Sequence, residues 1–167
     1  YDFNGNGWNP IGGGDNYGNN KFTGMFDGSG YSIIGMRIAI TSEILKTSYI
    51  GLFSNVTGTV KNLTIRDGAI NCLTNANFYI GSIAAYCTGN IINCHNNMDI
   101  NGYSSAQSKS FSVVIGGITG YAGSDSSIKC CINSGNISCK ALLESETSTS
   151  SYYYSGGIAG DGYGPVP

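Results

Sequence analysis

Charged residues and long apolar segments are scarce in this chain. Its 167 residues include 8 Lys and Arg against 10 Asp and Glu, so that 11% are charged, where soluble proteins average about 25%. The net charge of -2 argues against binding to nucleic-acid phosphates. No apolar run approaches the roughly 18 residues of a membrane-spanning helix. We therefore expect no nucleic acid among the partners and no membrane insertion.

Metal ligands are scarce too. His95 is the single histidine, and the six cysteines include no C-x2-C pair of the kind that binds zinc. Six cysteines are also too few, at this length, for a disulfide-stapled scaffold. The string that begins at Asp27 lacks the regularly repeated aspartates of a calcium-binding β-roll. The sequence therefore predicts neither a metal nor a cofactor.

Glycine and apolar residues are plentiful by contrast. The chain has 26 Gly, 12 Tyr and 6 Phe but only 3 Pro. Apolar residues make up 41% of it, which is too many for a disordered polar tract. This composition favours an all-β protein with many turns over a helical enzyme.

An internal repeat is the strongest signal in the sequence. Residues 49–70, 79–100 and 114–137 align by eye, and a fourth block begins at residue 154. The anchor glycines of the blocks follow one another at intervals of 30, 35 and 40 residues: Gly51, Gly81, Gly116 and Gly156. Repeats of this size are typical of solenoids, in which each repeat buries its apolar side against its neighbours.

The pattern inside a block indicates strands, because apolar residues alternate with a period of two. The column that follows the anchor glycine by two residues is apolar throughout and is expected to face the core: Phe53, Ile83, Ile118 and Ile158. A second strand is expected to begin at Val60, Ile91 and Ile128.

A corner must follow the start of the second strand. Asn62, Asn93 and Cys130 occupy this corner, where asparagine tolerates the bend and stacks its amide along a ladder. Farther along, one column changes from apolar to polar, for which the sequence offers no reason: Ile65, Asn96 and Asn133.

Each block ends in an isoleucine and is followed by an insert. The block-ending residues are Ile40, Ile70, Ile100 and Ile137, and the inserts cover residues 41–47, 71–77, 101–110 and 138–151. In a stacked fold the inserts emerge along one edge, which repeat proteins often use for binding. The alternative is that they are slack, since the entropy of loop closure grows slowly with length.

Two cysteine pairs share columns of the repeat. If Cys94 and Cys131 lie on neighbouring coils, their Cα atoms are about 4.8 Å apart, within the range of a disulfide. The alternative is two buried thiols that pack as small apolar residues. Cys72 and Cys139 also share a column, but their coils are two apart.

Catalytic groups are hard to assemble from this sequence. Parallel β-helices include carbohydrate-active enzymes, and glycoside hydrolysis needs two nearby carboxylates. Asp67 and Asp99 both precede a block-ending isoleucine and are the pair that successive coils could bring together, the alternative being solvated turn carboxylates. Cys94 and His95 are adjacent in a strand, so their side chains point to opposite sides and cannot readily share a proton. We expect no catalytic residues.

Tyrosines recur in one column at Tyr49, Tyr79 and Tyr154, and Val114 interrupts it. Exposed aromatic rings bind sugars through their flat faces. The alternative is that the rings stack on one another within the fold. A ligand-binding site therefore stays unassigned from the sequence.

Three strings carry a resemblance to a known family: "WNPIGG" from Trp8, "KFTGMFDGSGYSIIGMRI" from Lys21 and "YIGLFSNVTGTVKNLTI" from Tyr49. Together they resemble the GLUG-type repeat region of bacterial surface and secreted proteins, as found beside IgA-cleaving metallopeptidases and in adhesin-like chains. The resemblance implies a right-handed parallel β-solenoid and an extracellular, non-catalytic role. The chain departs from the pattern at Gly81–Ser82 and in its long last insert.

We therefore expect one all-β domain over residues 1–167, a right-handed parallel β-solenoid of about five or six coils. The chain begins at Tyr1 without a signal peptide, and we expect it to be an excerpt of a longer array. The expected function is that of a stalk, spacer or adhesin segment at the cell surface or outside the cell. The expected partners are flanking domains, glycans or matrix proteins. A carbohydrate-active enzyme or a glycan-binding module is the alternative.

Overall fold

The computed structural model describes residues 7–13, 20–40, 47–74, 76–104, 112–141 and 152–163. These ranges contain eighteen β-strands and no helix, so none of them supplies a helix that could cross a membrane. All pairs of named strands are parallel, and they form four sheets. The chain is therefore an all-β protein of parallel sheets, which confirms the predicted class.

The first and second sheets hold the strands from the second half of each sequence block, together with β1–β3, which precede the first block. The first sheet contains β1 (Met25–Asp27), β6 (Thr59–Lys61), β10 (Asn90–Ile92) and β14 (Ser127–Lys129). The second contains β2 (Ser32–Ile34), β3 (Arg37–Ile40), β7 (Thr64–Thr74), β11 (His95–Ser104), β15 (Ile132–Asn133) and β16 (Ile137–Ala141).

The third and fourth sheets hold the strands from the first half of each sequence block. The third contains β4 (Ser48–Ile50), β8 (Phe78–Gly81), β12 (Ser112–Gly116) and β17 (Tyr152–Gly156). The fourth contains β5 (Phe53–Val56), β9 (Ala84–Cys87), β13 (Thr119–Ala122) and β18 (Ala159–Gly162).

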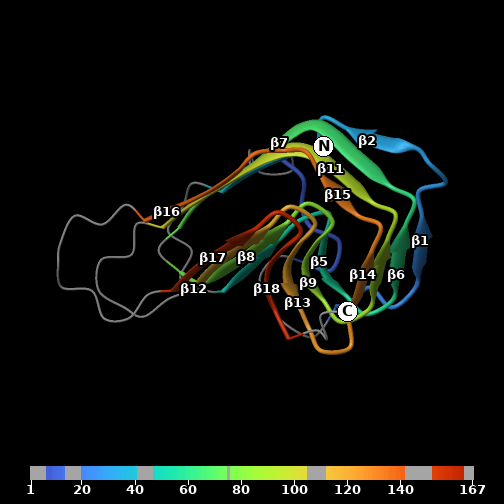
Figure 1. The fold of residues 1–167 in the computed structure, drawn as a ribbon. Helices are drawn as coiled ribbons and strands as arrows, with labels where there is room; N and C mark the ends of the chain where they lie inside the picture. The colour runs from blue at the N-terminus through green and yellow to red at the C-terminus, as the bar shows by residue number, and fades with distance from the viewer. Residues whose placement is uncertain are drawn as a thin grey trace.

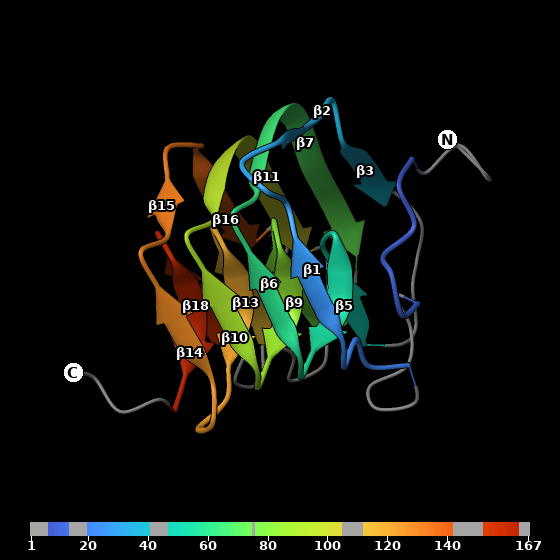
Figure 2. The same ribbon diagram turned by 90° about the vertical axis from the view of Figure 1, so that its right-hand side faces the viewer.

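Consecutive strands make sets that stack on one another, and we call each set a tier. The first to fourth tiers are β1–β5, β6–β9, β10–β13 and β14–β18. Figure 1 looks along the stacking direction, so the strands of one sheet overlap around a shared interior. Figure 2, turned by a quarter, shows β14, β10, β6 and β1 side by side. This arrangement is compatible with a β-helix or solenoid.

The strand register confirms most columns of the repeat. Val60 pairs with Ile91, and Ile91 pairs with Ile128, as predicted for the second strand. The anchor glycines of the last three blocks are also in register: Gly81, Gly116 and Gly156. Parallel pairing in register therefore places equivalent residues of successive repeats on top of one another.

One column of the sequence alignment is wrong by one position. Phe53 pairs with Ala84 and not with Ile83. The reason lies in the corner before Phe53. Ile50 pairs with Ile80, but Phe53 is three positions after Ile50, whereas Ala84 is four positions after Ile80. The single-residue difference shifts the first block against the second without removing Phe53 from the core.

The block-ending residue of the first tier is also corrected. Ile100 pairs with both Ile70 and Ile137, as predicted. The residue that pairs with Ile70 in the first tier is Ile38, however, while the predicted Ile40 pairs with Cys72. Ile38 and Ile40 are two positions apart, so both still face the same side of their strand.

Three of the predicted inserts begin later than expected, because their first residues continue a strand. β7 extends to Thr74, β11 to Ser104 and β16 to Ala141, so each strand passes its block-ending isoleucine by four residues. The other insert residues lie almost wholly outside the described ranges, at positions 41–46, 75, 105–110 and 142–151.

The core lies between the sheets and consists of inward-facing columns. Phe53, Ile83 and Ile118 are fully buried, and Ile158 packs half-buried against the same core. Phe22 and Phe26 pack beside Phe53, with ring centroids 4.7 and 5.7 Å from that of Phe53. Burial of these side chains supplies the main favourable free energy of the fold.

The predicted corner is confirmed by the backbone. Asn62, Asn93 and Cys130 have φ values of 54°, 52° and 53°, in the left-handed region that asparagine tolerates better than most residues. The amide of Asn93 donates to that of Asn62 at 2.8 Å, and Asn62 donates to Asp27 at 3.0 Å. This ladder fastens three successive tiers along one outer corner.

Asp27 ends the ladder as an exposed carboxylate. The hydrogen bond from Asn62 and the one from the backbone N–H of Ser29 lower the pKa of Asp27, and Lys61 Nζ lies 3.2 Å from its Oδ2. The charged form is therefore the one that the ladder holds. This contribution is present at neutral pH and is lost as the pH falls through the lowered pKa of Asp27.

A second amide ladder explains the column that turns polar inside the fold. Asn96 is fully buried, and its Nδ2 donates to Met98 O at 3.0 Å and to Asn133 Oδ1 at 2.7 Å. Its Oδ1 accepts the Met98 N–H at 3.1 Å, and Asn133 Nδ2 donates to Gly135 O at 3.0 Å. Both side chains replace backbone partners at a bend, so polar residues are satisfied there.

Residues 7–13 and 20–22 run beside the outer edge of the first tier. The N–H of Ile11 donates to Leu52 O at 2.9 Å, and the N–H of Phe22 donates to Asn55 O at 2.9 Å. Trp8 Nε1 also donates to Leu52 O, at 3.3 Å. The "WNPIGG" string therefore covers part of the strand edge that β5 would otherwise expose.

A glycine in a stacked turn supplies the first prediction. A Cβ on Gly89 would lie 2.1 Å from the carbonyl oxygen of Gly58 in the tier below, a backbone atom that cannot rotate away. We expect Gly89→Ala to destabilise the protein by about 1–3 kcal/mol in urea unfolding. Gly157→Ala is the control, because its Cβ would meet no atom within 4 Å. Equal losses in the two variants would contradict this packing.

The buried amide ladder supplies the second prediction. Asn96→Ala removes three hydrogen bonds inside the core and leaves the Met98 N–H and Asn133 Oδ1 without this partner. Unfolding free energy should fall by about 2 kcal/mol or more, since each buried unpaired group costs about 1–3 kcal/mol. Asn101→Ala, which removes an exposed bond of 2.9 Å to Asn71, should cost less than about 0.5 kcal/mol. A neutral Asn96→Ala would refute the ladder.

Candidate functional site

The two carboxylates considered from the sequence, Asp67 and Asp99, are out of register and have different partners. Asp99 pairs with Ala69, because β7 holds an extra residue at a bulge opposite Met98. Asp67 lies in that bulge with a φ of 57° and forms an ion pair with Arg66. Asp99 Oδ1 instead accepts hydrogen bonds from the backbone and side chain of Asn136, at 3.1 and 3.0 Å.

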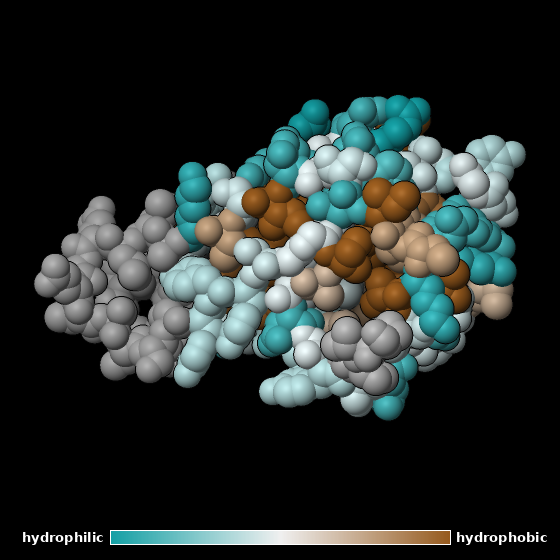
Figure 3. Space-filling model, in the orientation of Figure 1, coloured by the Kyte–Doolittle hydropathy of each residue, from teal (hydrophilic) through white to brown (hydrophobic). Residues whose placement is uncertain are grey.

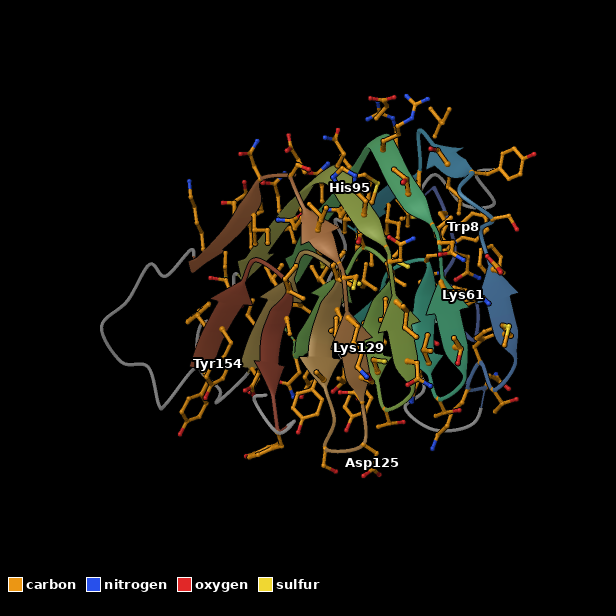
Figure 4. All side chains as sticks on the ribbon, turned by 45° about the vertical axis from the view of Figure 1, so that its right-hand side comes forward. Trp8, Lys61, His95, Asp125, Lys129 and Tyr154 are labelled. Carbon is orange, nitrogen blue, oxygen red and sulfur yellow. The ribbon has the colours of Figure 1, made fainter. Side chains whose placement is uncertain are left out.

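His95 and Cys94 lie on opposite sides of the chain, as predicted. Cys94 is buried in the core, while His95 is half-buried on the outer side and its Nε2 hydrogen-bonds with Ser134 Oγ. Figure 4 shows His95, Asp125 and Tyr154 in separate parts of the surface. The arrangement does not form a nucleophile with its base.

Within the described ranges, no three His, Cys, Asp or Glu side chains are grouped so that they could hold a metal ion. Five of the ten acidic residues belong to these ranges, namely Asp27, Asp67, Asp99, Asp125 and Asp161. The other five lie outside them: Asp2, Asp15, Glu43, Glu144 and Glu146.

The tyrosine column exists and forms a stack. Tyr49 pairs with Tyr79, and Val114 pairs with Tyr79 on one side and Tyr154 on the other, so Val114 interrupts the column as predicted. The rings of Tyr49 and Tyr79 are 5.3 Å apart and inclined by 4°. On β13, the ring of Tyr121 contacts that of Tyr79 in a T-shaped arrangement, with the ring centroids 6.3 Å apart.

A second stack lies on the neighbouring strands, where the rings of Tyr86 and Tyr121 are 4.7 Å apart and inclined by 16°. A sugar ring would need an open aromatic face, and stacked rings cover the faces of one another. These tyrosines therefore act first as ladders between tiers. More open rings lie on the fourth tier, where Tyr163 is 77% exposed and Tyr152 and Tyr154 are 50% and 40% exposed.

The thiols differ in their surroundings, and all six are free. Burial raises the pKa of Cys72 and of Cys87 to about 12. Gly102 pairs with Cys72 on one side and Cys139 on the other, so that this cysteine pair is separated by a whole tier, as predicted. Cys130 is exposed at its corner.

Cys94 and Cys131 lie on neighbouring tiers, as the repeat predicts. The strands on either side of them pair Ile92 with Lys129 and His95 with Ile132, and the N–H of Ile132 donates to Cys94 O at 2.9 Å. The interaction between the two thiols lowers the pKa of Cys131 and raises that of Cys94.

The outer face of the fourth tier is the largest departure from a closed core. Inward residues of the third tier are at most 1% exposed: Ile91, Cys94, Ile100, Val113 and Ile118. The equivalent residues of the fourth tier are only half-buried: Ile128, Cys131, Ile137, Tyr153 and Ile158. Figure 3 looks onto this tier and shows apolar residues gathered in its centre.

Polar backbone groups accompany this apolar face. β14, β17 and β18 each pair with one other strand and are last in their sheets among the described residues. We call these strands and the half-buried side chains above the fourth-tier face. The repeat itself predicts exposed strand edges at the ends of a stack, and every inward column of the sequence continues into the last block.

No protein-family model matches this chain, and searches of curated proteins and of solved structures gave no match. The resemblance to the GLUG-type repeat region therefore stays a prediction.

The fourth-tier face generates the third prediction. Open strand edges beside apolar side chains favour association with another β-surface. We expect the 167-residue chain to self-associate as its concentration rises, as measured by sedimentation velocity. Ile128→Glu should weaken this association, because it places a charge within the face. Ile34→Glu, on an outward residue of β2 that is 60% exposed, should leave it unchanged.

A chain that stays monomeric at high concentration would contradict the prediction, as would an equal effect of the two substitutions. Circular dichroism of both variants separates weakened association from unfolding.

Proposed function

We propose that the chain is a non-catalytic, extracellular repeat module that serves as a stalk or spacer in a larger bacterial surface protein. In this proposal the tiers form a right-handed parallel β-solenoid. The four tiers and the segment before β1 give it about five coils. The resemblance of Trp8–Gly13, Lys21–Ile38 and Tyr49–Ile65 to GLUG-type repeats supports the location and the role.

The fourth-tier face is the observation that carries the proposal. A further repeat of the same kind, placed on this face, would pair with β14, β17 and β18 and cover side chains such as Ile128 and Ile158. Addition of one tier would therefore supply hydrogen-bond partners to the strand edges and bury the apolar columns. A structure that grows by identical steps of about 4.8 Å along one axis is suited to set a distance between other domains.

The tyrosine stacks favour a spacer over an adhesin. The rings of Tyr49, Tyr79, Tyr86 and Tyr121 contact one another, and such contacts contribute to the cohesion of successive tiers.

Glycan binding is the second candidate, and the exposed tyrosines of the fourth tier favour it. Tyr152 and Tyr154 alternate along β17, and their rings lie nearly parallel at 6.2 Å. Two rings on the same side of a strand could together contact more than one sugar residue. This role would make the chain an adhesin segment.

A binding screen separates the two candidates and is the fourth prediction. The chain is applied to a glycan array and to immobilised matrix proteins, and we expect no specific binding, since a spacer needs none. Incubation with polysaccharides should release no reducing sugar. Such release would contradict the non-catalytic role.

Saturable binding that disappears in Tyr152→Ala/Tyr154→Ala would replace the spacer by an adhesin. Tyr31→Ala is the matched control, because Tyr31 is 79% exposed on another part of the molecule. Equal loss in this control would mean that binding does not use the tyrosine pair.

A further inference from the structure

Cys94 and Cys131 occupy equivalent positions on neighbouring tiers. The same offset of 37 residues relates the pairs Ile92 with Lys129 and His95 with Ile132, and Cys94 and Cys131 share it. Neighbouring parallel strands hold such residues about 4.8 Å apart at Cα. Disulfides span Cα separations of roughly 4.4–6.8 Å, so the backbone already meets this requirement.

The two sulfur atoms occupy equivalent positions one tier apart. Cys94 Sγ contacts Val60 O at 3.8 Å and Ile92 O at 3.5 Å, and Cys131 Sγ makes the equivalent contacts with Ile91 O at 3.5 Å and Lys129 O at 3.3 Å. The two sulfur atoms are therefore neighbours in one column of the stack. Cys94 is 1% exposed, while Cys131 belongs to the half-buried fourth-tier face.

The two thiols are chemically unequal, which suits exchange. The neighbouring Cys94 thiol favours the thiolate of Cys131, so the pKa of Cys131 is lowered. Thiolates are the attacking species in thiol–disulfide exchange. Cys131 is therefore both the more accessible and the more nucleophilic member of the pair.

We propose that Cys94 and Cys131 form a redox-active dithiol, which closes to a disulfide between the third and fourth tiers by exchange with a small-molecule disulfide of the glutathione type. The proposal goes beyond the spacer function and concerns the chain with its fourth-tier face uncovered, since a further tier on that face would also cover Cys131. Closure would tie the last described tier covalently to the one beneath it.

The reaction balances in two exchanges. The thiolate of Cys131 attacks one sulfur of the small disulfide, which forms a mixed disulfide and expels the other half as a thiolate. That thiolate takes the proton of Cys94, whose sulfur then attacks Cys131 Sγ and expels the second half as a thiolate, which is protonated from water. The two protein thiols lose two electrons, and the small disulfide gains them as it becomes two thiols.

The test, which is the fifth prediction, uses the native chain in glutathione buffers of increasing oxidised fraction. After acid quenching, free thiols are alkylated and tryptic peptides are sequenced by tandem mass spectrometry. We expect a peptide linked between Cys94 and Cys131, two fewer alkylated thiols and full reversal by dithiothreitol. The same treatment in urea should lose this selectivity.

Three variants assign the roles. In Cys94→Ser, glutathione should remain on Cys131 as a mixed disulfide. In Cys131→Ser, Cys94 should stay reduced because it is buried. Cys130→Ser is the matched control, since Cys130 is exposed and adjacent in sequence, and it should leave the yield of linked peptide unchanged.

Two results would overturn the proposal. One is a native wild-type chain in which Cys130 acquires glutathione while Cys94 and Cys131 stay reduced in the most oxidising buffer. The other is a dominant link between any other pair of cysteines. Both readings come from the wild-type protein, so they do not depend on whether a variant folds.

Discussion

Backbone pairing between equivalent strands of successive tiers is the interaction on which the structure depends. A parallel pair in register places each residue on its counterpart one repeat away, as Val60, Ile91 and Ile128 illustrate. Inward apolar residues therefore form continuous columns, and turns must superimpose. This explains the glycines at positions 58 and 89, because a Cβ on Gly58 or Gly89 would lie within about 2 Å of a carbonyl oxygen of the tier below.

The same constraint turns polar residues into ladders. Asn62 and Asn93 join their amides along the outer corner, and Asn96 and Asn133 do so inside the fold. An amide both donates and accepts, so a column of asparagines satisfies its own hydrogen bonds at any length. Such columns supply order where an apolar residue would leave the bend of the backbone without partners. Buried polar side chains are here part of the repeat itself.

The sequence predicted the features that depend on the period of the repeat. Strand alternation, the corner at Asn62 and Asn93 and the neighbouring positions of Cys94 and Cys131 all follow from the equal spacing of residues inside each block. The errors arose where one block gains or loses a residue. The shorter corner before Phe53 shifted its column, and the extra residue at Asp67 separated that carboxylate from Asp99. A single residue in a turn changes the register but leaves the apolar pattern almost unchanged, so the pattern alone could not reveal it.

The fourth-tier face links this architecture to its proposed role, because a stack that repeats one step offers the same pairing surface after each tier. Everything therefore depends on parallel pairing of consecutive tiers. The most direct measurement is a nuclear Overhauser spectrum of the isotope-labelled chain at the strands containing Val60, Ile91 and Ile128. Parallel tiers predict contacts from amide protons to Hα protons between these strands, in the order Val60, Ile91, Ile128. Strong Hα–Hα contacts between them, which antiparallel hairpins produce, would contradict the account.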